Sequence, residues 1–133
     1  MGPETRELID GIRACLAGRT DVRLALLFGS RARGVHRPDS DVDIAVVALG
    51  VDPAALSAEL STALGLEVDV VVLTDPGVPL LERLVDEAHV VHEGERGAAA
   101  SWRTAALLTL ETDRPWYRRM RDAFLSRVAR SGV

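Results

Sequence analysis

Short apolar runs alternate with segments of helical periodicity along this chain. Three apolar runs between turn signals predict buried strands over 22–28, 41–49 and 66–74, and 89–93 predicts a short edge strand. Apolar residues that recur every three or four positions predict helices over 4–17, 54–65, 80–88 and 98–112. Strands that alternate with helices indicate an α/β (α+β) domain, with a sheet of three or four strands and helices packed on it.

The C-terminal part of the chain carries a separate apolar pattern. Pro115 is expected to break or restart the helix there. Beyond it, Tyr117, Met120, Phe124 and Val128 line one face of a last helix. Such a stripe is more often core than interface. It remains a candidate surface for a partner or for a second copy of this chain, that is, a homo-oligomer.

Length and composition indicate one globular domain over 1–133, with a core at about 20–95 and a helical segment at about 98–130. The chain has 133 residues, of which 47% are hydrophobic and 27% charged. No apolar run approaches the ~20 residues that span a bilayer, and the acidic N-terminus lacks a signal-peptide core. Cys15 is the only cysteine, so no disulfide framework is expected. We expect a cytoplasmic protein with no membrane contact.

Charge is unevenly distributed along the chain. The net charge is −4, which disfavours nucleic acid as a direct substrate. From residue 113 onward, however, six arginines face two aspartates, a surplus of +4 that leaves −8 on the remainder.

Carboxylates stand where an apolar strand begins. Asp41 and Asp43 are two positions apart, so their side chains point to one face while Val42 and Ile44 point to the core. Asp69 has a similar setting in the third apolar run and joins them if the two strands are neighbours. Clustered carboxylates repel and need a cation, and their oxygens suit Mg²⁺. Taken alone, an Asp-x-Asp pair is more often a solvated strand end.

A glycine-serine loop precedes these acids and supplies groups for phosphate binding. Gly29 lets backbone approach a ligand, and Ser30 offers a hydroxyl and an N–H. Arg31 and Arg33 are candidate phosphate partners, although each alone is equally well explained as a solvated loop residue. The lysine of a P-loop is absent after Gly34, so this is not a Walker A motif. Loop and acids together indicate phosphoryl or nucleotidyl chemistry.

These motifs resemble a known family. Gly29-Ser30, ten residues, Asp41-x-Asp43 and a later Asp69 match the signature of minimal nucleotidyltransferases (MntA-type antitoxins) in the DNA polymerase β superfamily. Two short sequences are also typical of that family, namely Gly-Ser-Arg-Ala-Arg-Gly and Ser-Asp-Val-Asp-Ile. The similarity extends through VPLLERLVDEAHVVHEG into the C-terminal helix and so covers nearly the whole chain. The long proline-containing tail departs from the pattern.

The resemblance implies a nucleotidyltransferase fold, with a mixed, twisted sheet and helices mainly on one face. It implies an enzyme (EC 2.7.7 type) that uses ATP and Mg²⁺, with two ions expected, to transfer AMP to a tyrosine of a partner HEPN-domain RNase toxin. By the same resemblance, Asp41 and Asp43 hold the metals. Asp69 completes one metal site and helps to deprotonate the incoming hydroxyl, while Gly29 and Ser30 hold the triphosphate.

Two other functions remain open at this point. The first is a non-catalytic antitoxin that neutralises its toxin by contact, but loss of an acid would be its signature and no acid is lost. The second is a small-molecule, aminoglycoside-like nucleotidyltransferase, which usually carries an added C-terminal domain. About thirty residues after Ala98 leave little room for one.

His89 and His92 would face opposite sides of a strand and make a poor metal pair, and His36 is expected to be a solvated loop residue.

Overall fold

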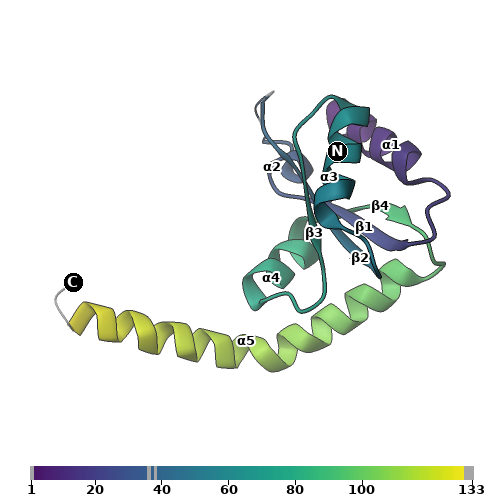
Figure 1. Ribbon diagram of the computed structural model, residues 1–133. Coiled ribbons are helices and arrows are strands. Elements are labelled where there is room, and N and C mark those ends of the chain that lie inside the picture. Colours follow the sequence, from purple (N-terminus) through teal and green to yellow (C-terminus); the bar gives the residue numbers. More distant parts are fainter. Residues whose placement is uncertain (1, 36, 38, 131–133) are drawn as a thin grey trace.

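The computed structural model describes residues 2–35, 37 and 39–130 of the chain (Figure 1). His36 therefore lies outside the described residues. The strands are β1 (Val22–Phe28), β2 (Val42–Ala48), β3 (Val68–Val72) and β4 (His89–Glu93). The helices are α1 (Pro3–Leu16), α2 (Ser30–Arg33), α3 (Pro53–Leu64), α4 (Val78–Glu87) and α5 (Ala98–Arg130). The predicted order of strands and helices is confirmed as far as β4, and α2 is an additional short helix after Gly29.

The four strands form one mixed sheet in the order β3-β2-β1-β4. β1 pairs antiparallel with both β2 and β4, whereas β2 and β3 run parallel. The prediction of a mixed sheet with β4 at an edge is confirmed. The second and third predicted strands are neighbours, which is the condition that the acidic cluster required.

Helices cover both faces of the sheet, so the expectation that they lie mainly on one face is wrong. One core lies between the sheet and α1 with α3, and includes Ile12, Leu27, Ile44 and Leu60. A second core lies against α4 and the start of α5 (Figure 1). The physical reason is the composition of the central strands. β1 and β2 are apolar at both odd and even positions, so each face must be shielded from water.

Helix α3 begins and ends as its sequence predicts, and it also shields the edge strand β3. The Asp52 carboxylate accepts from the Ala54 N–H, and Gly65 ends the helix in the left-handed conformation. The N–H groups of Val68 and Val70 donate to serine hydroxyls of α3, each at 3.0 Å. These bonds satisfy the outer side of β3 and hold the strand that carries Asp69.

Helix α5 runs without interruption through Pro115, so the predicted break there is wrong. A proline removes one helical N–H bond and crowds the carbonyl four residues earlier, but an exposed helix accommodates this by bending. Figure 1 shows α5 as one curved helix whose C-terminal part projects away from the sheet. None of the helices in the described ranges is both long and apolar enough to cross a membrane.

Candidate active site

Two of the predicted acids lie side by side on neighbouring strands. Asp43 of β2 is the register partner of Asp69 of β3, while Val42 and Ile44 are fully buried on the opposite face. Asp41 immediately precedes β2 and is exposed, and its charge contributes to raising the pKa of Asp43. The parallel pairing places Asp69 beside Asp43 on the sheet face that α4 covers, and Asp41 lies two residues before Asp43 in the chain.

The three carboxylates concentrate negative charge around Asp43. Partial burial raises the pKa of Asp43, the charge of Asp69 raises it further, and Arg83 acts in the opposite direction. A cation among these oxygens would relieve the repulsion, and hard carboxylate oxygens suit Mg²⁺. Within the described residues, no three acidic, histidine or cysteine side chains already converge on one ion position. The donor set fits the metal in its chemistry.

Gly29 brings the two halves of the sequence motif into contact. It follows β1, whose last residue Phe28 is the register partner of Asp43. Its backbone has φ of 80° and ψ of −160°, a conformation that is essentially restricted to glycine. A Cβ atom at this position would overlap Oδ2 of Asp43. Glycine is therefore required both for the turn into α2 and for the close approach to the carboxylate.

Glu87 is a site residue that the sequence reasoning missed. The Gly29 N–H donates to Glu87 Oε1 at 3.2 Å, and Arg33 Nη1 lies 3.0 Å from Oε2. Arg83 Nε is 3.5 Å from Oε1, and the Arg83 guanidinium stacks 5.3 Å from the centre of the Phe28 ring. The available signal was the Arg83–Glu87 spacing of four residues on a helix. That spacing does not reveal a partner 58 residues away.

The charge state of Glu87 follows from these contacts. Partial burial raises the pKa of the Glu87 carboxyl, but hydrogen bonds from Arg33 and the Gly29 N–H outweigh it and set the pKa below its usual range. Glu87 is therefore ionised at neutral pH. It holds one backbone donor of the glycine-serine loop and two guanidinium groups beside Asp43.

The two arginines of the loop differ in their surroundings. Arg31 is only 8% exposed, and its Nε and Nη2 atoms donate to the Ser40 carbonyl at 3.2 and 3.0 Å. These two hydrogen bonds connect the two ends of the loop that separates Gly29-Ser30 from Asp41. Arg33 lies at the solvent edge on Glu87, and Ser30 is half-buried at the start of α2. His89 Nε2 lies 3.0 Å from the Ala32 carbonyl, so β4 also supports α2.

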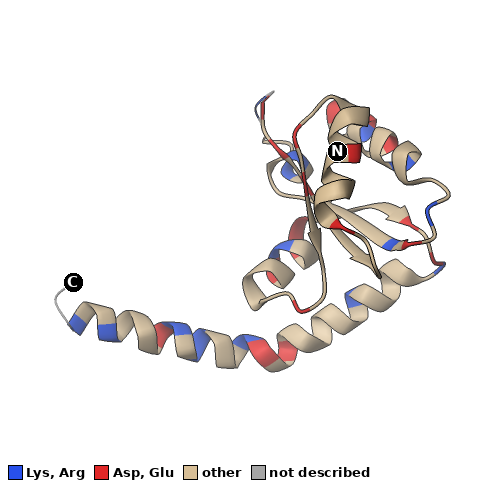
Figure 2. Ribbon diagram, viewed as in Figure 1, with Lys and Arg blue, Asp and Glu red and all other residues tan. Residues whose placement is uncertain are grey.

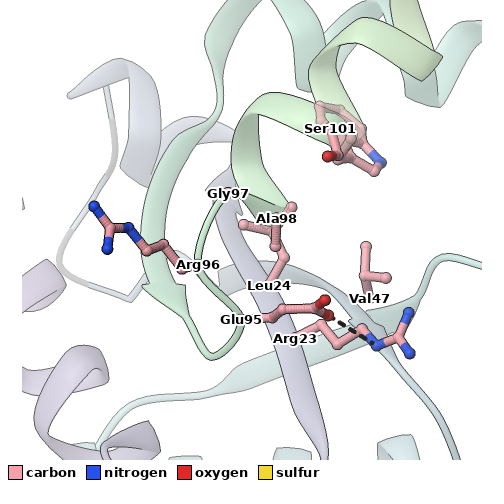
Figure 3. Close-up of a pocket in the computed structure, with 9 residues that line it drawn as sticks. Arg23, Leu24, Val47, Glu95, Arg96, Gly97, Ala98 and Ser101 are labelled. Carbon is pink, nitrogen blue, oxygen red and sulfur yellow. Dashed lines mark ion pairs between the residues drawn. The ribbon is translucent and has the colours of Figure 1, made fainter.

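A separate hollow of about 380 Å³ lies at the other end of the strands (Figure 3). Leu24 and Val47, which are register partners, form its floor, and an Arg23–Glu95 ion pair of 3.4 Å borders it. Leu24 is four residues from Phe28 along β1, roughly 13 Å at the rise of a strand. This hollow is therefore distinct from the acidic cluster and contains none of its residues.

Comparison with known proteins identifies the fold family. The family model described as polymerase beta, nucleotidyltransferase matches residues 10–96, which include all the predicted site residues. The chain belongs to the polymerase beta nucleotidyltransferase family. The predicted family and nucleotidyltransferase fold are thereby confirmed. No curated protein matches this chain.

Among solved structures of this nucleotidyltransferase fold, a putative minimal nucleotidyltransferase is 32% identical, covering 67% of this chain and 95% of the other, with a TM-score of 0.51. A toxin–antitoxin crystal structure with AMP-PNP is 22% identical, covering 88% and 98% of the two chains, with a TM-score of 0.74. A complex of a tri-AMPylated Shewanella oneidensis HEPN toxin with an MNT antitoxin is 20% identical, covering 91% and 98%, with a TM-score of 0.70.

Proposed function

We propose that this nucleotidyltransferase is an antitoxin that uses Mg²⁺ and ATP to transfer AMP to a tyrosine of a HEPN-domain RNase toxin. The observation that carries the proposal is the register pairing of Asp43 with Asp69 directly beside Gly29. The loop proposed to bind phosphate and the oxygens proposed to bind the metal are therefore adjacent. The similar structures support the nucleotide and the partner, since one contains AMP-PNP and another a tri-AMPylated HEPN toxin.

The chain's own residues have distinct roles in the proposed reaction. Ser30 binds the triphosphate through its hydroxyl and its N–H, and Arg33 and Arg83 neutralise part of the triphosphate charge. Asp69 is exposed, so its carboxylate is accessible to an incoming tyrosine and accepts the hydroxyl proton. The phenolic oxygen attacks the α-phosphorus of ATP, the bond to pyrophosphate breaks, and pyrophosphate leaves. Mg²⁺, held by Asp41, Asp43 and Asp69, would stabilise charge on the attacking and leaving oxygens.

Intact mass spectrometry tests this proposal. The purified chain is incubated with Mg²⁺ and each NTP, alone and with the product of the adjacent gene, the candidate HEPN-domain toxin. We expect the toxin to gain one or more AMP masses, and the gain to disappear in Asp43→Asn. Asp39→Asn is the matched control, because Asp39 is an exposed aspartate of the loop that precedes β2 and lies outside the strand register.

Other outcomes would assign the chain differently. A stable complex without any mass gain would indicate an antitoxin that neutralises by contact. A gain from GTP, CTP or UTP in place of ATP would correct the donor. Transfer that persists in Asp43→Asn would contradict the assignment of Asp43 as a metal ligand.

A further inference from the structure

The face of α5 that packs on the rest of the molecule continues beyond it. Ala106 and Leu110 are 4% and 2% exposed and pack against α4, and Tyr117 contacts the same cluster. Steps of three and four residues then lead to Met120 and Phe124 on the same side of the helix. These side chains are 50% and 57% exposed. We call residues 118–130 the arm.

The arm combines this apolar face with a strong positive charge. Five arginines and one aspartate give it a net charge of +4, and the other residues of the chain carry −8. Figure 2 shows the basic positions spread along the projecting part of α5. By helical geometry, Arg121 flanks the Met120–Phe124 stripe on one side and Arg127 on the other. A surface that complements the arm would therefore be an apolar stripe with acidic borders.

A second copy of this chain does not supply such a surface. Two arms packed together would bring two charges of +4 into contact, which like-charge repulsion opposes. Leu107, Leu108 and Trp116 of α5 are exposed outside the arm, but Leu107 and Trp116 are nine residues apart and point to opposite sides of the helix, so they form no stripe. The other exposed large apolar side chains among the described residues outside the arm are Val35, Leu49 and Val90. They lie after α2, after β2 and on β4, so they do not form a stripe. RNA would match the arginines but would leave the apolar face exposed.

We propose that the arm is the docking surface for the toxin, and that it binds a helix whose apolar stripe is bordered by Asp and Glu. The identity of the partner rests on the proposed function. Leu110, Tyr117 and Phe124 are spaced seven residues apart, a repeat that suits side-by-side packing of two helices. The arm thus extends the face that α5 already uses against α4.

A pair of matched substitutions tests the docking surface in the full-length chain. Phe124→Glu places a charge on the stripe, and Leu108→Glu places one on an equally exposed position (60%) of the same helix, on the side away from it. Affinity for the purified product of the adjacent gene, the candidate HEPN-domain toxin, is measured by calorimetry without nucleotide. We expect Phe124→Glu to raise Kd at least about tenfold and Leu108→Glu to leave it unchanged. Circular dichroism checks that both variants are folded.

Each alternative outcome overturns the proposal. Equal toxin affinity of the two variants would remove the arm from the interface. Light scattering that shows a wild-type dimer and a Phe124→Glu monomer, with toxin affinity unchanged, would assign the arm to self-association. Loss of binding to a labelled oligouridine RNA, again with toxin affinity unchanged, would assign it to RNA.

Failure of this inference is distinguishable from failure of the proposed function. If the toxin binds through the arm but gains no AMP, the enzymatic proposal fails and the docking surface stands. If AMP is transferred and Phe124→Glu binds like wild type, the docking surface fails and the enzyme stands.

Discussion

Gly29 is where backbone conformation and site chemistry depend on the same residue. Its φ of 80° and ψ of −160° disfavour any side chain, and a Cβ atom would also meet Asp43. Gly34 also has a positive φ, of 73°, but a Cβ atom there would meet no other atom. Substitution of Gly34 by alanine therefore measures the cost of the backbone conformation without a steric clash.

We expect Gly29→Ala to lower the free energy of unfolding by roughly 2–3 kcal/mol, and Gly34→Ala by about 1 kcal/mol. The difference reflects displacement of the Asp43 carboxylate, so only Gly29→Ala should also abolish AMP transfer. Urea unfolding and the mass assay measure the two effects. Equal losses of stability would show that contact with Asp43 has no energetic consequence.

Glu87 holds the glycine-serine loop through the Gly29 N–H and Arg33. We expect Glu87→Ala to weaken AMP-PNP binding by about tenfold, because one hydrogen bond to a charged group and the position of two arginines are lost. Glu87→Gln keeps an acceptor for the Gly29 N–H and should lie between Ala and wild type. Glu82→Ala is the control, because Glu82 lies on α4 like Glu87 but pairs with Arg114 of α5. Tighter binding by Glu87→Ala in a fluorescence titration would show that Glu87 competes with the nucleotide.

The pKa of Asp43 predicts a pH-dependent stability. Burial and then Asp69 raise this pKa above the ordinary 3.8, so the folded protein binds the proton more tightly than the unfolded chain. The contribution of Asp43 therefore falls as pH rises from about 3.8 through the raised pKa. We expect Asp43→Asn to be more stable than wild type at pH 7, on the order of 0.5–1 kcal/mol, and the gain to shrink toward pH 4. A gain that is constant between pH 4 and 7 would refute the linkage.

Helix α5 is the element whose sequence opposes its structure most directly. Pro115 lies inside a helix of 33 residues and leaves the Glu111 carbonyl without its helical donor. We expect Pro115→Ala to stabilise this part of α5 by roughly 1–3 kcal/mol and to straighten it. Slower hydrogen exchange at amides 116–122 would report the gain. Unchanged hydrogen exchange would mean that local opening of the exposed helix, and not Pro115, sets the exchange rate of these amides.

The whole molecule consists of a folded unit and a projecting arm. The side chains of the arm are mostly exposed, so few contacts with the rest of the chain are lost when it is removed. We expect truncation after Tyr117 to shift Tm by no more than about 3 °C and to leave nucleotide affinity unchanged. Leu110→Ala, at a residue 2% exposed, should instead cost about 2–4 kcal/mol. A large loss of Tm on truncation would show that the arm stabilises the fold.

The sequence by itself determined the strands, most of the helices and the candidate residues of the site. Period-two and period-three-to-four patterns are local, so they are legible without tertiary contacts. The same parity that buries Val42 and Ile44 places Asp41 and Asp43 together, and residue types alone indicate phosphate and metal chemistry.

Only the tertiary structure decided which distant groups meet. Parallel pairing of β2 with β3 places Asp69 beside Asp43, and α4 brings Glu87 to the Gly29 N–H. It also decided that α4 and α5 cover the second sheet face, and that the apolar face of α5 is buried at Leu110 but exposed at Phe124. Both stretches have the same periodicity. The difference arises because burial depends on what packs opposite a residue, and no local pattern contains that information.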